Sequence, residues 1–398
     1  MRENGRVRSD YGGSGGFSGF GGDLQELVDE VSALLGAPAT LEDRDFRLIA
    51  FGVHDGDDGA TDPVRTRSIL TRGSTTEVRA WFEQFGITRA TGPVRIPAAP
   101  SAGVFRGRLC LPVRHGGVVH GYVWLLDEAE HTADQLDAAM AVAARIGDRL
   151  AVTAREGAGT GRALRDLLTA RTRAARDNAE DALRTALGPD ADEPHALVCI
   201  RPPSGGEDDL PGPRTVPSAA ALCFVPGPRG DCVALLVRLR TVQLLATARS
   251  AAARVLGEVA SEGAVAGVSD GRKSLAELPE AWREAGDAAR AALAQPLHGP
   301  IAKWSGIGPY RLLTALPADA APDPVIAPLL SPAHSELAHT AEAFLDNAGQ
   351  AGRTATALAI HRQTLYYRLS RIEQLTGLDL ADGESRLLLH MALKAARL

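Results

Sequence analysis

A short basic segment near the carboxyl end of the chain carries the residue types best suited to contact nucleic acid. Between Ile360 and Ile372 there are three arginines and no aspartate or glutamate. A guanidinium can fork onto guanine or phosphate, glutamine can pair with adenine, and hydroxyl groups can donate to phosphate. We predict that DNA is contacted by His361, Arg362, Gln363, Thr364, Tyr367, Arg368 and Arg371.

The apolar spacing in this segment predicts a helix that presents its basic side outward. Leu365, Leu369 and Ile372 recur at i, i+4 and i+7, which is the spacing of one buried helical stripe. The helix is expected to begin near His361 or Arg362. From charge alone, an ordinary amphipathic helix with a merely solvated basic side explains the segment equally well.

The surrounding residues predict three further helices that position this one. A helix opens at Ser335 and is ended by Gly349, because glycine suits a helix C-terminus. A short helix is expected from about residue 352 to residue 358. The last helix, over residues 384–393, should pack on the other three because its leucines are too apolar to stay exposed. Together they predict an all-α domain over residues 333–398.

Upstream of this domain the sequence predicts two α+β units. Over residues 24–155 we expect helices, a strand at 46–51, a β-hairpin turning at Gly116-Gly117, and a long helix over 131–155. Over residues 160–315 the order is a helix at 162–187, three strands, and then alternating helices and strands. That order suggests an antiparallel or mixed sheet with helices on one face. Residues 1–23 should be a disordered Gly-rich tail, and 316–332 a linker.

Composition limits what else the chain can be. The formal net charge is −6, so any DNA contact must come from a local basic patch and not from the whole molecule. No apolar run is long enough for a membrane span and the N-terminus lacks a secretory signal pattern, so a cytoplasmic protein is expected. We expect no cofactor.

The cysteines and histidines predict no metal site. The four cysteines are scattered without a C-x-x-C pair, which indicates reduced and mostly buried thiols. Their spacing does not support the alternative, a metal or redox site. His115 and His120 flank the hairpin turn and His131 follows, but no acidic residue or cysteine joins them at ligand spacing.

Several segments resemble the PucR/CdaR family of bacterial transcription regulators. The run Ile360-His-Arg-Gln-Thr-Leu-Tyr-Tyr-Arg-Leu369 and the following Leu375-Thr-Gly-Leu-Asp-Leu380 resemble its C-terminal helix-turn-helix, although Gln363 stands where the family usually has asparagine. Gly267-Val-Ser-Asp-Gly271 and Trp304 to Leu313 resemble its degenerate GGDEF-like domain. The hairpin segment resembles GAF- and PAS-like sensor domains.

The resemblance implies a multidomain α+β regulator. It would have a GAF/PAS-like sensor, a degenerate GGDEF-like middle domain and a helix-turn-helix that binds double-stranded operator DNA in response to a small-molecule effector. One alternative is a signalling scaffold without DNA binding. Another is a nucleotide cyclase, but the turn Gly227-Pro-Arg-Gly-Asp231 lacks the Gly-Gly-(Asp/Glu)-Glu-Phe sequence, and the strands beside it lack the carboxylates that such an enzyme needs to hold metals.

A homodimer or higher oligomer is expected, because one helix-turn-helix covers only a few base pairs. The long helices over 131–155 and 162–187 are the candidates for holding protomers together. The first has an apolar stripe that includes Leu136, Met140, Ile146 and Leu150. The alternative is that this stripe is used by its own domain.

Overall fold

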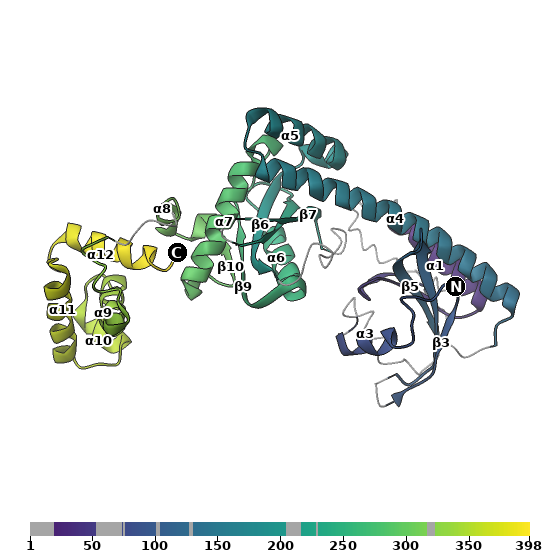
Figure 1. Cartoon of the computed structure of the whole chain (residues 1–398), viewed down its shortest axis with the longest axis horizontal. Helices are drawn as coiled ribbons and strands as arrows, with labels where there is room; N and C mark the ends of the chain where they lie inside the picture. Colours follow the sequence, from purple (N-terminus) through teal and green to yellow (C-terminus); the bar gives the residue numbers. More distant parts are fainter. Residues whose placement is uncertain are drawn as a thin grey trace, which may run out of the picture. The chain divides into compact units, whose positions relative to one another are not determined.

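The chain forms two compact units, Met1–Glu156 and Gly157–Leu398, in the computed structural model (Figure 1). Most of the predicted tail, the loop over 204–215 and part of the predicted linker lie outside the described residues. The structure describes residues 20–52, 74, 76–100, 104–126, 130–203, 216–227, 230–316 and 323–398.

The first unit is built on an antiparallel sheet with strand order β2-β1-β5-β4-β3. The predicted hairpin is confirmed: its strands meet at Gly116 and Gly117, whose positive φ angles suit a glycine. The short first strand was not expected, because its Thr-Leu-Glu-Asp sequence is mostly polar. The strands are β1 (Thr40–Asp43), β2 (Leu48–Phe51), β3 (Val94–Ile96), β4 (Arg108–His115) and β5 (Val118–Leu126).

Helices cover both faces of this sheet. One face packs against α1 (Phe20–Leu35) and the first part of α4 (Ala133–Thr169). The other face packs against α3 (Thr76–Glu83) through an aromatic cluster, in which the ring centroids of Phe82 and Trp124 lie 4.8 Å apart. Alternation of apolar residues along β4 and β5 explains both layers, because successive side chains point to opposite faces.

The apolar stripe that we considered for dimerisation is used within this unit. Ala139, Val142, Ala143 and Ile146 of α4 are buried against the sheet, and the flanking apolar side chains pack on the same cluster. The expectation that this face of the helix joins two protomers is therefore wrong. The sequence alone could not decide this, because an apolar stripe looks the same whether it meets its own domain or a second chain.

Glu42 makes the stability of the first unit depend on pH between about 4.5 and 8. This carboxyl group is buried on the aromatic side of the sheet, and desolvation raises its pKa from 4.5 to about 8, with a further contribution from Asp43. The pKa in the folded state lies above that of the unfolded chain. The contribution of the protonated Glu42 carboxyl group to stability is therefore complete below pH 4.5 and is lost as the pH rises toward 8.

We therefore expect the free energy of unfolding of the first unit to fall by roughly 1.4 kcal/mol per pH unit as the pH approaches 8 from below. Glu42→Gln imitates the protonated carboxyl group and should remove most of this dependence. Urea titrations of both chains at a series of pH values would measure it. An equal slope in the wild-type chain and the Glu42→Gln variant would show that another group titrates.

The second unit is built on a mixed sheet with strand order β10-β9-β6-β8-β7, in which β9 and β10 are parallel and the other neighbours are antiparallel. The expected strands and the mixed sheet are confirmed. The strands are β6 (His195–Pro203), β7 (Ala219–Val225), β8 (Cys232–Arg238), β9 (Ala260–Val268) and β10 (Ile301–Lys303).

Helices cover both faces of this sheet, and the expectation of helices on one face is wrong. Helix α7 (Leu278–Ala294) packs on one face together with the end of α4, whereas α6 (Ala246–Val259) packs on the other (Figure 1). The composition of strands β6 and β8 explains why helices cover the second face as well. Their residues are apolar on both sides, so either face left open would expose a row of hydrophobic side chains.

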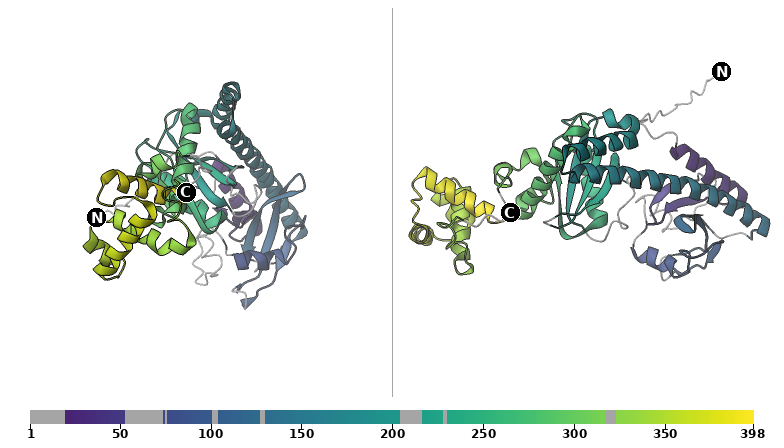
Figure 2. Two further views of the ribbon diagram at one scale, coloured as in Figure 1. Left: turned by 60° about the vertical axis from the view of Figure 1, so that its left-hand side comes forward. Right: turned by 45° about the horizontal axis from the view of Figure 1, so that its top comes forward.

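Helix α4 does not end near Arg155 as expected but runs without a break to Thr169 (Figure 2). The glycines after Glu156 lie within the helix. Gly161 passes so close to the carbonyl oxygen of Leu222 that a Cβ atom there would overlap it. The break falls instead before α5 (Arg173–Leu187), where the side chain of Thr172 accepts a hydrogen bond from the backbone of Ala175.

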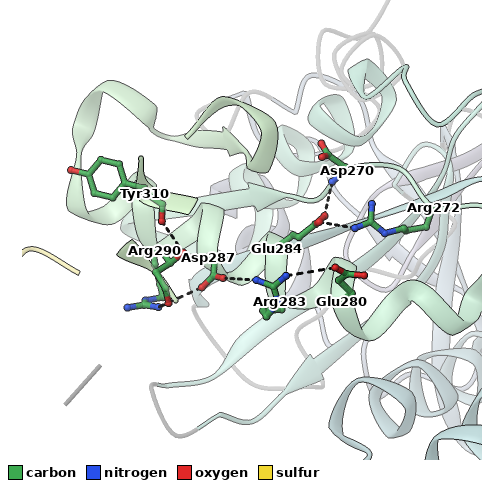
Figure 3. Close-up of polar contacts among 9 residues, drawn as sticks. Asp270, Arg272, Glu280, Arg283, Glu284, Asp287, Arg290 and Tyr310 are labelled. Carbon is green, nitrogen blue, oxygen red and sulfur yellow. Dashed lines mark hydrogen bonds and ion pairs between the residues drawn. The ribbon is translucent and has the colours of Figure 1, made fainter. Parts of the chain in front are cut away.

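Helix α7 carries a line of ion pairs (Figure 3), and their burial differs along the helix. Glu284 is buried, lies 2.6 Å from the guanidinium of Arg272 and accepts a hydrogen bond of 3.1 Å from the backbone of Asp270. One turn earlier, Glu280 pairs with Arg283 at 3.8 Å, and both side chains are more than half exposed. The first pair ties α7 to the chain that follows β9, whereas the second is solvated.

Candidate nucleic-acid interface

The carboxyl-terminal segment folds into four helices around a separate apolar core (Figure 2). The core also contains Ile326 and Leu329, which lie in the segment expected to be a linker and are fully buried. The predicted helices are confirmed to within a few residues. They are α9 (Ser335–Asp346), α10 (Ala351–Ala357), α11 (Arg362–Thr376) and α12 (Gly383–Ala395).

A tight turn sets the angle between α10 and α11. Ala359 has a φ of 53°, a left-handed conformation that is unusual for a residue with a side chain. The backbone N–H of Ile360 then donates to the carbonyl oxygen of Ala355, which closes the turn. The residue that caps α11 is His361, whose Nδ1 accepts a hydrogen bond of 3.2 Å from the backbone of Gln363. A cap at this position leaves the first turn of α11 open to solvent.

Helix α11 buries one side and exposes the other, as its spacing predicts. Leu365, Leu369 and Ile372 lie in the core, together with Thr376. The opposite side is polar and aromatic, and the Tyr367 side chain is 73% exposed. The predicted DNA-contact residues that are exposed are His361, Arg362, Gln363, Thr364, Tyr367 and Arg371.

Arg368 differs from the other predicted residues because it points to the neighbouring helix. Its guanidinium is bonded to the carboxylate of Glu336 and donates to the hydroxyl of Thr340 at 3.3 Å, both on α9. Only 18% of the Arg368 side chain is exposed, and Thr340 is fully buried. In this arrangement the residue holds α11 against α9. Its role as a phosphate contact remains a prediction.

The structure adds two residues to the exposed face that the sequence reasoning missed. Ser370 and Gln374 are exposed and follow Gln363 and Tyr367 at i, i+4, i+7 and i+11, so the four lie in one row along α11. The signal was present in the spacing, because these positions fall opposite the buried stripe. Arg371 lies beside this row, where it donates to Gln374 at 3.1 Å.

The charge on the exposed face of α11 is positive. Its one acidic residue, Glu373, accepts a hydrogen bond of 3.0 Å from the backbone of Leu380 and so is engaged with the turn toward α12. The arginines at both ends of the first three turns, Arg362 and Arg371, are exposed. A helix with outward arginine, glutamine and tyrosine side chains can contact base edges and phosphates in the major groove.

Ion pairs hold the last helix in place, and one of them is buried. Glu342 on α9 is buried and pairs with Lys394 and Arg397 at the end of the chain. Asp346, one turn later, lies 3.0 Å from Lys394 and 2.9 Å from His390, and these contacts lower its pKa against the opposing effect of desolvation. Helix α12 therefore braces α9, which in turn supports α11.

In the described residues of the middle of the chain, several acidic side chains are engaged in ion pairs. Carboxylates on α7 are paired with arginines, as Glu284 is with Arg272 and Asp287 with Arg290 at 3.4 Å (Figure 3). Within the described ranges, no group of three or more histidine, cysteine, aspartate or glutamate residues is placed to hold a metal ion. Among those same residues, no helix is both long and apolar enough to cross a membrane.

The fold and the exposed helix define a multidomain α+β chain that ends in a helix-turn-helix. The model of the PucR C-terminal helix-turn-helix domain matches residues 337–395, and the model of a GGDEF-like domain matches residues 171–291. These are the two domains that the resemblance of the motifs to the PucR/CdaR family predicts.

Known regulators are similar to parts of the chain. The purine catabolism regulatory protein of Bacillus subtilis (strain 168) is 31% identical over 137 residues, which are 33% of this chain and 26% of that protein. The carbohydrate diacid regulator of Escherichia coli (strain K12) is 61% identical over 41 residues, 10% of this chain and 11% of that protein. The transcriptional activator PmfR of Paenarthrobacter nicotinovorans is 53% identical over 47 residues, which are 12% of this chain and 10% of that protein. The matched segments span about a quarter or less of these relatives.

Proposed function

We propose that this protein is a sequence-specific DNA-binding transcription regulator without enzymatic activity. The observation that carries the proposal is the exposed face of α11, with arginine, glutamine and tyrosine side chains outward in a PucR-type helix-turn-helix. Two of the similar proteins are named as regulators and a third as a transcriptional activator, which supports the same function. Action in the cytoplasm, where bacterial operators are found, follows from this proposal.

The rest of the chain would supply regulation. In this proposal residues 24–155 form a GAF/PAS-like sensor for a small-molecule effector, and 160–315 a GGDEF-like domain that passes the signal to residues 333–398. The layered sheet of the first unit and the family match in the middle of the chain support this division. Residues 316–332 would connect the last two parts, with Ile326 and Leu329 anchored in the final core.

Binding of the full chain to double-stranded DNA tests the function directly. Sites selected from genomic fragments should share a sequence, and the affinity for them should fall steeply with salt because arginines displace counterions from phosphate. Recovery of unrelated fragments with one common affinity would mean non-specific binding. No binding at low salt would favour the alternative, a signalling scaffold that does not bind DNA.

Two arginines of α11 are expected to act differently. Arg362→Ala removes an exposed guanidinium from the end of the helix that usually reaches base edges. It should relax sequence preference and weaken specific binding by about 1 to 3 kcal/mol. Arg368→Ala instead removes a link to α9, so it should lower the thermal stability and weaken binding to all DNA sequences by the same amount. Binding profiles and melting curves for both variants would separate these effects, and identical profiles with unchanged stability would contradict both assignments.

A homodimer on a symmetric or repeated operator completes the proposal. One recognition helix covers only a few base pairs, and two half-sites about one helical turn apart would give regulatory affinity. The buried stripe of α4 is already used, so the protomers would meet through another surface. Sedimentation of the full chain with and without an operator tests this, and a monomer in both conditions would exclude it.

A further inference from the structure

Three of the four cysteines lie on one face of the second sheet, beneath α7. Cys199 is in the middle of β6, Cys223 is on β7, and Cys232 is the first residue of β8. Ala234 on β8 pairs with Cys199 on one neighbouring strand and with Cys223 on the other. Cys232 lies two residues before Ala234. The register thus places Cys232 diagonally next to both of the others, although the three positions are far apart in the sequence.

The neighbouring thiols of Cys232 and Cys199 influence each other's pKa. The interaction with Cys199 lowers the pKa of Cys232 to about 7, with a further contribution from Arg201, although burial acts in the opposite direction. The interaction with Cys232, together with burial, raises the pKa of Cys199. Cys232 is therefore the thiol that ionises more readily.

The position of Cys232 gives this sulfur a route to solvent. Cys199 is 1% exposed, whereas Cys232 is 8% exposed and directly follows the exposed residues Gly230 and Asp231. Its sulfur also lies 3.8 Å from the carbonyl oxygen of Gly230 at the end of the turn. A small oxidant would reach Cys232 at the strand end first, because Cys199 lies deeper in the core.

We propose that Cys232 and Cys199 form an oxidant-sensitive thiol pair, which a peroxide converts into an intramolecular disulfide. The thiolate of Cys232 attacks one peroxide oxygen, the O–O bond breaks, and a sulfenic acid and water result after proton transfer. The sulfur of Cys199 then attacks the sulfenic sulfur, the S–O bond breaks, and a second water leaves. Two thiols and one hydrogen peroxide thus give one disulfide and two waters.

The disulfide would change the start of strand β8. Diagonal neighbours on adjacent strands have Cα atoms about 7 to 8 Å apart, and a disulfide needs less than about 7 Å. The start of β8 must therefore move toward β6, away from its partner Val225 on β7. The movement is confined to a strand end that adjoins an exposed turn, where few ladder hydrogen bonds must be rearranged. A dithiol reductant would reverse it.

The full chain treated with hydrogen peroxide, blocked with an alkylating reagent and digested without reduction tests the proposal. We expect a linked peptide that joins Cys199 to Cys232, the loss of two thiols per chain, and recovery of both with a dithiol. In Cys199→Ser the reaction should stop at a sulfenic acid on Cys232, which a cyclic dione traps. Cys223→Ser is the matched control on the same sheet face and should oxidise like the wild-type chain.

A second measurement needs no variant of the pair. The alkylation rate of Cys232 in the native chain should reach half its maximum near pH 7, well below the value of about 8.5 for an ordinary cysteine. Arg201→Gln should shift that midpoint upward and slow the oxidation. A linked peptide through Cys223, oxidation of Cys232→Ser as fast as the wild type, or an ordinary alkylation midpoint would overturn the proposal.

Discussion

Glu284→Ala is expected to lower the free energy of unfolding of the second unit by about 3 kcal/mol. The Glu284 carboxylate is buried, and its removal leaves the guanidinium of Arg272 without its charged partner and the backbone N–H of Asp270 without its acceptor. A nearly buried charge that loses its partner retains the cost of desolvation and loses the attraction that offset it. Urea unfolding of the full chain would measure the loss.

Glu280→Ala is the matched control, one helical turn away on the same helix. The pair of Glu280 with Arg283 is more than half exposed on both sides, so its removal should change stability by less than about 1 kcal/mol. If both substitutions cost the same, the difference in burial would not be what stabilises α7, and helix propensity would explain both results.

Gly267→Ala is the second large effect that we expect, with a loss of about 3 kcal/mol or more in the second unit. A Cβ atom at Gly267 on β9 would overlap the backbone of Ala285 and Ala289 on α7. Backbone atoms cannot rotate away as a side chain can, so α7 would have to move off the sheet. Thermal melting of the variant and its expression as folded protein would show the effect.

Gly286→Ala tests whether this cost comes from close packing and not from glycine as such. Gly286 lies in α7, and an added Cβ there would meet nothing within 4 Å. Since alanine is the better helix former by roughly 1 kcal/mol, this variant should be slightly more stable than the wild-type chain. Destabilisation by both substitutions would contradict the close approach of α7 and β9.

Most of the candidate site could be predicted from the sequence because it depends on local spacing. The buried stripe of α11 repeats at i, i+4 and i+7, which fixes the exposed positions on the other side of the same helix. Six of the seven predicted contact residues are exposed. Whether they touch DNA is still a prediction, because exposure alone does not distinguish a binding face from a solvated one.

Arg368 shows the limit of that reasoning. Its place on the helix puts it beside the exposed face, but its direction depends on Glu336 and Thr340, which lie on another helix. A long side chain takes the partner that offers the best hydrogen bonds, and spacing along one helix does not show what the next helix offers. The same holds for Gly161 of α4, where a glycine is required because the helix passes close to the backbone of β7.

The sequence by itself determined the local elements of this protein: the carboxyl-terminal helices, the hairpin at Gly116-Gly117 and the main strands of the second sheet. Each follows from a repeat or a turn signal within a few residues of chain. Only the tertiary structure decided that helices cover both faces of each sheet, which glycines are needed for packing and which cysteines are neighbours. Those features join residues distant in sequence, and they depend on strand register and helix packing, which no single segment encodes.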